Sequence, residues 1–84
     1  MPTISIFYGI RVYFNLTSKE HSPPHIHAKY GEYNASFNIK DKCLKEGKFP
    51  DRATKLVIEF INQYEEELLK MWETEEYKTL KGLD

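Results

Sequence analysis

The stretch HIHAKYGEYNASFNIK, residues 25–40, decides the fold because it specifies one hairpin. Apolar and polar residues alternate on both sides of Gly31-Glu32, as they do in strands that bury one face. A two-residue turn there sets apolar residues opposite one another on one face: Tyr30 with Tyr33, Ala28 with Ala35, and Ile26 with Phe37. The other face then carries His25, His27 and Lys29 opposite Asn38, Ser36 and Asn34. Hydrophobic alternation and turn position therefore predict the same register.

A further strand is expected before this hairpin, where alternate residues are apolar: Ile10, Val12, Phe14 and Leu16. Pro23 and Pro24 lie in the connecting segment and keep it extended and non-helical. After the hairpin, a tight turn at Asp41-Lys42 is expected to continue the meander and to place Cys43 opposite Lys40, on the histidine face. Residues 1–48 are therefore predicted to form an antiparallel β-meander of three to four strands.

The second half of the chain has a helical pattern. From Pro50 onward, apolar residues recur at steps of three and four: Ala53, Leu56, Val57, Phe60, Ile61, Tyr64, Leu68, Met71 and Trp72. Pro50 suits the first helical position, and Asp51 suits the positive end of the helix dipole. We expect one long C-terminal α-helix over residues 50–76 and a tail over residues 77–84. The chain, 1–84, is predicted to be a single α+β domain with the helix on the apolar face of the sheet.

Composition restricts the setting of this domain. The chain has 84 residues and one cysteine, Cys43, so no internal disulfide can form. It has no apolar run long enough for a membrane span and no signal-peptide pattern at its start, which leads us to expect a cytoplasmic protein without membrane contact. Residues 1–50 carry seven basic against four acidic residues, and residues 51–76 carry eight acidic against three basic. Neither half has the dense basic clustering of a nucleic-acid binder, so direct nucleic-acid binding is not expected.

All three histidines lie within seven positions: His21, His25 and His27. Residues two apart on a strand project to one face roughly 6–7 Å apart, close enough for His25 and His27 to share one metal ion. The two prolines stiffen the loop and lower the entropy cost of folding His21 back beside the pair. Three imidazoles predict a metal site, with zinc as the first candidate and other divalent transition metals as alternatives.

The fourth ligand is left open among Cys43, Glu20, Glu32, water and a residue of a partner. Cys43 is expected two strands away from the histidine strand, roughly 10 Å off, which argues against it. Two other interpretations compete with a metal site: polar residues on a solvated sheet face, and a histidine-lined surface for an anion or a partner. Buried core histidines are disfavoured, because the alternation places His25 and His27 away from the apolar face.

An open metal position would also permit hydrolysis by a metal-bound water, assisted by Glu20, Arg11 or Tyr13. The sequence shows no convergent acid–base constellation and no glycine-rich phosphate loop, so an enzyme is disfavoured. The leading expectation is a non-enzymatic metal-binding module that binds and modulates a larger protein. The alternatives are a metal-dependent hydrolase or nuclease toxin and a metal-free nucleic-acid-binding module.

Three segments resemble the small bacterial proteins that carry the domain of unknown function DUF4160: MPTISIFYGIRVYF, HSPPHIHAKYGEYNASFNI and LKEGKFPDRATKLVIEFINQYEEELLKMW. The resemblance places His21, His25 and His27 on the family's histidine motif, whereas Cys43 stands where an aliphatic residue is usual. It implies no established activity. It does imply a mobile-element setting similar to toxin-antitoxin pairs or phage inhibitors such as anti-CRISPR proteins. The expected partner is then a nucleic-acid-handling protein such as an RNA-guided nuclease. The chain itself is expected to be a monomer or a weak dimer.

Overall fold

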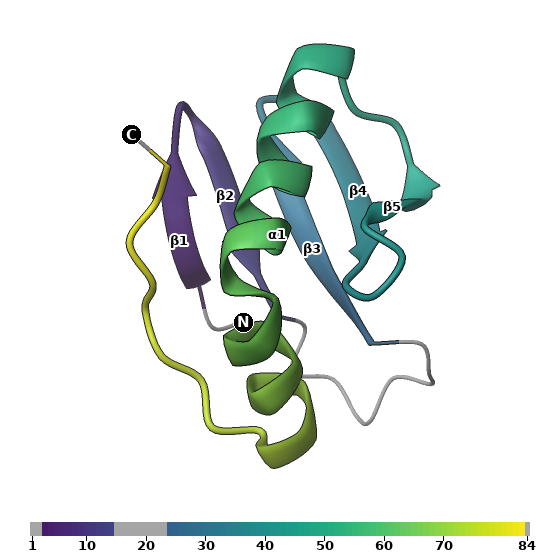
Figure 1. Ribbon diagram of the computed structural model, residues 1–84. Coiled ribbons are helices and arrows are strands. Elements are labelled where there is room, and N and C mark those ends of the chain that lie inside the picture. Colours follow the sequence, from purple (N-terminus) through teal and green to yellow (C-terminus); the bar gives the residue numbers. More distant parts are fainter. Residues whose placement is uncertain (1–2, 15–23, 84) are drawn as a thin grey trace.

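A computed structural model describes residues 3–14 and 24–83 and shows a sheet covered on one face by a long helix (Figure 1). The elements follow in the order β1 (Thr3–Phe7), β2 (Ile10–Tyr13), β3 (His25–Tyr30), β4 (Tyr33–Asn38), β5 (Cys43–Gly47) and α1 (Asp51–Thr74). The five strands lie in the sheet in chain order, and each neighbouring pair is antiparallel. The predicted α+β meander with one C-terminal helix is therefore confirmed. None of the described helical residues forms a segment long and apolar enough to cross a membrane.

The sheet has five strands, more than the three to four that the sequence predicts. Thr3–Phe7 forms its own strand and joins β2 through a turn at Tyr8-Gly9, where φ is 50° and 79°. Tight hairpin turns with two positive φ angles favour Asn-Gly or Asp-Gly, because most side chains are strained in this conformation. Because the first position of this turn is a tyrosine, the sequence does not predict a turn there, and it does not predict β1 as a separate strand.

The register of the central hairpin is the predicted one. The structure pairs Tyr30 with Tyr33, Ala28 with Ala35, Ile26 with Phe37, and the polar residues His25, His27 and Lys29 with Asn38, Ser36 and Asn34. The predicted register between β4 and β5 is wrong, because Cys43 pairs with Asn38 and not with Lys40. The turn spans residues 39–42, with Lys42 at a φ of 53°, and is longer than the tight turn expected.

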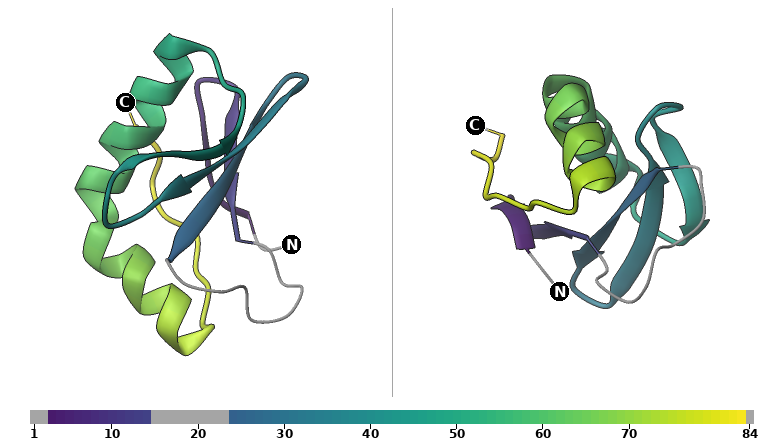
Figure 2. Two further views of the ribbon diagram at one scale, coloured as in Figure 1. Left: turned by 90° about the vertical axis from the view of Figure 1, so that its right-hand side faces the viewer. Right: turned by 90° about the horizontal axis from the view of Figure 1, so that it is seen from below.

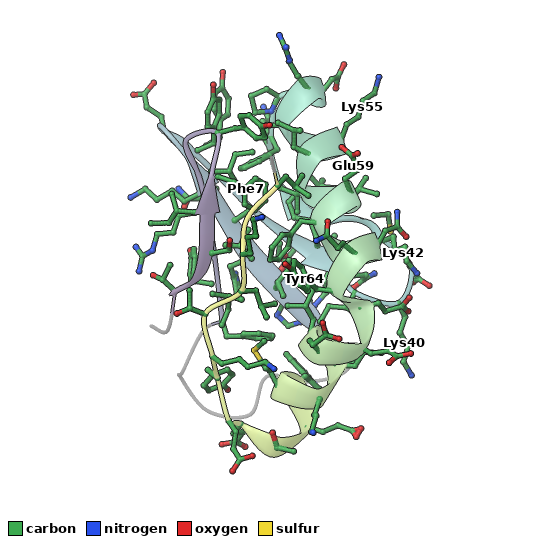
Figure 3. All side chains as sticks on the ribbon, turned by 60° about the vertical axis from the view of Figure 1, so that its left-hand side comes forward. Phe7, Lys40, Lys42, Lys55, Glu59 and Tyr64 are labelled. Atoms are coloured by element: carbon green, nitrogen blue, oxygen red, sulfur yellow. The ribbon has the colours of Figure 1, made fainter. Side chains whose placement is uncertain are left out.

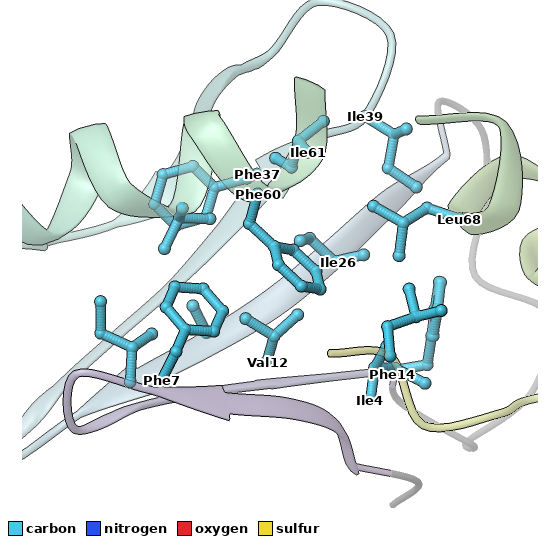
Figure 4. Packing of buried hydrophobic residues seen from close by; sticks show 14 of the residues in the cluster. Ile4, Phe7, Val12, Phe14, Ile26, Phe37, Ile39, Phe60, Ile61 and Leu68 are labelled. Carbon is cyan, nitrogen blue, oxygen red and sulfur yellow. The ribbon is translucent and has the colours of Figure 1, made fainter. Parts of the chain in front are cut away.

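The core lies between the sheet and α1 (Figure 2). The helix contributes six buried residues: Ala53, Val57, Phe60, Ile61, Leu68 and Met71. Phe7 of β1 stacks on Phe60 with ring centroids 5.0 Å apart, and Figure 4 shows how the apolar side chains of the two layers face one another. Tyr64 leaves helical geometry, with φ −119° and ψ 24°, and points with Phe7 into the space between helix and sheet (Figure 3). The predicted apolar stripe of the helix therefore forms the second layer.

The helix ends two residues earlier than predicted, and the tail that follows packs on the domain. Glu75 has a φ of 60° and a backbone N–H that donates to the Met71 carbonyl, a left-handed cap that ends α1. The tail then runs beside β1 (Figure 1), where the Leu80 N–H donates to the Ile4 carbonyl at 2.7 Å and the Leu80 side chain is buried. Tyr77 packs on Phe14 with ring centroids 5.1 Å apart. The tail thus completes the core.

Burial of the Tyr77 side chain raises the pKa of its hydroxyl, and the Glu75 carboxylate raises it further. The burial agrees with a tail that is held against the domain.

Replacing Leu80 tests the contribution of the tail. Leu80→Ala removes a buried side chain and should lower the free energy of unfolding by about 2 kcal/mol, measured by urea denaturation. Lys78→Ala, an exposed position on the same tail, is the control and should leave the midpoint unchanged. Equal midpoints for native protein and Leu80→Ala would show that the tail does not pack as described.

A substitution of Gly47 tests the position of β5 beside β4. Gly47 has a φ of 91°, and a side chain there would overlap the Asn34 carbonyl oxygen and lie 2.9 Å from the Ala35 Cα. Gly31 has a φ of 60° with nothing within 4 Å of the same atom, so it is the matched control for backbone strain alone. Gly31→Ala should cost about 1 kcal/mol of stability and Gly47→Ala distinctly more. A Gly47→Ala chain as stable as Gly31→Ala contradicts the β4–β5 register.

Candidate functional site

The candidate site lies on the outer face of the sheet, where the polar residues of β3 project, and at the His25 end of β3 it reaches the last turns of α1. His27 pairs with Tyr13 of β2 on one side and with Ser36 of β4 on the other. His25 pairs with Asn38 of β4. Because cross-strand partners project to the same face, the alternation of β2, β3 and β4 together brings these side chains to one place.

Five side chains form a continuous series of contacts, here called the ring row. The Arg11 guanidinium carbon lies 5.1 Å from the centre of the Tyr13 ring. Tyr13 stacks on His27 at 5.4 Å with the planes 21° apart. His27 meets His25 at 5.2 Å, and His25 meets Trp72 at 5.1 Å. The ring row therefore joins β2, β3 and the last turns of α1.

Arg11 is itself held in place, because its Nε donates to the Thr3 hydroxyl of β1 at 2.7 Å. The pairing of Tyr13 with His27 and of Arg11 with Lys29 places Arg11 and Tyr13 on the same face of the sheet as the histidines.

His25 is buried, with 4% of its surface exposed, and His27 is half-buried. The burial of His25 argues against the alternative interpretation in which both histidines are polar residues on a solvated sheet face. The predicted register of β3 and β4 is nevertheless correct. His25 begins β3, and this end of β3 and the last turns of α1 lie at the same end of the molecule (Figure 1), so the Trp72 ring reaches His25. The alternation of residues along a strand predicts to which face of the sheet each side chain projects. It does not predict whether a residue of a helix distant in sequence covers that side chain.

The separation of the two imidazole rings is compatible with a shared metal ion. A zinc ion bound tetrahedrally to two histidines at about 2.0–2.1 Å from each nitrogen holds their ring centres about 5 Å apart. The observed separation of the His25 and His27 centroids is 5.2 Å. Contacts with Trp72 and Tyr13 fix one ring each, so little side-chain entropy remains to be lost when a metal binds.

Asn38 adds an oxygen beside this pair. Its Oδ1 is buried and, within residues 3–14 and 24–83, accepts no hydrogen bond. Leaving a buried acceptor unpaired costs about 1–3 kcal/mol, so a donor or cation next to it would relieve that cost. Asn38 is opposite His25 in the sheet and is therefore a candidate oxygen ligand that sequence reasoning missed.

The other predicted ligands are not brought to this place. Glu32 is exposed in the β3–β4 turn, at the far end of the hairpin from His25. Cys43 is exposed on β5, two strand spacings or about 10 Å from β3. His21 and Glu20 lie outside the described residues. In the part of the chain that the structure describes, no three His, Cys, Asp or Glu side chains gather as a metal site would require.

Trp72 is the other member of the site that the sequence did not reveal. Its place on the apolar stripe of the helix assigned it to the core, and nothing in the sequence connects it to a histidine 47 positions earlier.

Comparison with known proteins supplies a family and no activity. The model of a family described as Domain of unknown function (DUF4160) matches residues 9–73, which include β3 with its two described histidines and nearly all of α1. No curated protein and no solved structure matches the chain.

The ring row can be tested through Trp72, the single tryptophan of the chain. His25→Ala removes a buried ring from between Trp72 and His27, so it should lower the free energy of unfolding by about 1–3 kcal/mol and shift Trp72 emission to longer wavelength. Lys29→Ala, an exposed position on the same face of β3, should change neither quantity. Unchanged emission in His25→Ala would show that the histidine does not cover Trp72.

Proposed function

The chain belongs to the family described as Domain of unknown function (DUF4160), and we propose from its own geometry that it is a small metal-binding, non-enzymatic interaction protein. It binds one zinc ion, or another divalent transition metal, and docks on a larger protein whose activity it modulates. The observation that carries the proposal is the pair of imidazoles, His25 and His27, held 5.2 Å apart beside an unpaired buried acceptor.

In this proposal His21 supplies the third imidazole, and water, a partner's residue or the Asn38 amide oxygen completes the shell. The metal acts as a staple. A domain of 84 residues has a small core, and metal binding adds folding free energy directly because the unfolded chain holds no formed site. Ligation of His25 also fixes the ring that packs on Trp72 and so strengthens the contact between β3 and α1.

The docking surface of this proposal is the acidic half of α1 and the residues after it. Four glutamates there are exposed: Glu66, Glu73, Glu75 and Glu76. The last turn of α1 contains no basic residue, although the helix dipole favours cations at that end. Acidic residues at the end of the helix where the dipole disfavours them suit a surface that opposes a basic partner, such as the nucleic-acid channel of an RNA-guided nuclease. The resemblance to the family, and not the charge pattern, suggests the proposed setting, which is a cytoplasmic anti-CRISPR or toxin-antitoxin system.

One observation favours a second candidate, a metal-dependent hydrolase or nuclease. Arg11 and Tyr13 continue the ring row from His27 on the outer face, so a cation and a phenol lie near the proposed metal. A guanidinium can hold a phosphate, and a metal with an open position can activate water. The interaction protein remains the primary proposal because the described residues include no acid–base pair beside the histidines.

Metal content tests the proposal most simply. Protein expressed with zinc should contain about one zinc per chain by elemental analysis, and chelation should lower the melting temperature by several degrees. The double variant His25→Ala/His27→Ala should contain none and show no response to chelator. Lys29→Ala, on the same face of β3, should keep both the metal and the response.

Native protein without stoichiometric metal, and with one melting temperature in the presence and absence of chelator, rejects the metal site. Metal-dependent cleavage of RNA, DNA or a model ester that is lost in Tyr13→Phe, with metal content kept, would favour the hydrolase over the interaction protein.

A further inference from the structure

The two edge strands of the sheet, β1 and β5, differ in whether another segment of the chain covers them. At the β1 edge the tail lies alongside, and the Leu80 N–H donates to the Ile4 carbonyl. At the other edge β5 has β4 on one side and, among the described residues, no strand on the other. All five residues of β5 are exposed. A bare edge presents backbone donors and acceptors that can pair with another strand.

An open apolar groove adjoins β5 where the chain turns into α1. The groove has a volume of about 520 Å³, and its walls include Tyr33, Leu44, Phe49 and Pro50. Two of these residues, Tyr33 and Leu44, are 47% and 38% exposed. Gly47 forms part of the wall.

The residues of β5 are complementary to a second copy of themselves. In an antiparallel pair of two β5 strands centred between Lys45 and Glu46, each Lys45 stands opposite the partner's Glu46, so two opposite-charge pairs form by symmetry. The same register sets Leu44 opposite the partner's Gly47. Leu44 and Gly47 share the helix side of the sheet, because they pair with Phe37 and Ala35 in β4.

We propose that a second copy of this chain docks on the β5 edge in this register. The Leu44 side chain of each copy enters the groove of the other beside Gly47, and the two sheets become one continuous sheet. Lysines and bulges at sheet edges usually prevent such pairing, and β5 has both. Here the lysine has its complement in the partner's Glu46, so it does not block this one register.

Charge reversal and charge exchange test the proposal by sedimentation equilibrium of the purified chain. The native protein should dimerise, and Lys45→Glu should weaken the dimer at least tenfold, because it sets the introduced carboxylate of one copy against Glu46 of the other. Glu46→Lys should do the same with two ammonium groups. The double variant Lys45→Glu/Glu46→Lys should restore dimerisation, since exchanged charges are again complementary.

Two further variants localise the contact. Leu44→Ala should weaken the dimer by emptying the groove, and Lys55→Glu, an exposed charge reversal on α1, should leave it unchanged. Circular dichroism establishes that each variant is folded. A native chain that stays monomeric up to about millimolar concentration, a double variant that stays monomeric while the native chain dimerises, or an equal effect of Lys55→Glu overturns the proposal. The mass measurement needs no metal, so it is independent of the function proposed above.

Discussion

The register between β3 and β4 is the constraint on which the rest of the structure depends. β3 is the central strand of the sheet, and Ile26 and Ala28 meet Phe37 and Ala35 on the face that α1 covers. A shift by one residue would turn these side chains to water and bring the histidines into the core. The cost of that exchange, several buried apolar side chains against two imidazoles, leaves one register available. The apolar side of this hairpin therefore determines where the polar side stands.

The environment of the two histidines of β3 is formed by residues of other elements. Tyr13 of β2 stacks on His27 and Trp72 of α1 packs on His25, whereas Asn38 of β4 lies opposite His25 in the sheet. His25 is the point where the outer face of the sheet meets the helix. In the proposed function, a metal bound at this histidine would be coupled to the packing of the second layer through Trp72.

The sequence predicted those features of the fold that depend on a periodic pattern or on a short local motif. The alternation in residues 25–38 and the Gly31-Glu32 turn predicted the hairpin pairs in full, and the stripe of apolar residues predicted the helix and its buried face. Prediction from the sequence failed where an unusual backbone conformation decides the chain path, as at Tyr8, Lys42 and Glu75, all at positive φ. For the candidate site it found the two histidines and Tyr13, whereas the contact between His25 and Trp72 depends on where the helix ends in space. No periodic pattern in the sequence predicts that contact.

The central claim is that the fold presents His25 and His27 to one metal ion. Diffraction from crystals of the zinc-loaded protein, with data collected above and below the zinc absorption edge, tests it most directly because the anomalous signal locates the metal independently of the protein atoms. The account predicts one strong peak on the outer face of the sheet, about 2.0–2.1 Å from a nitrogen of each of these two histidines. A peak bound elsewhere, or a zinc-loaded crystal with no ordered metal at this pair, would contradict it.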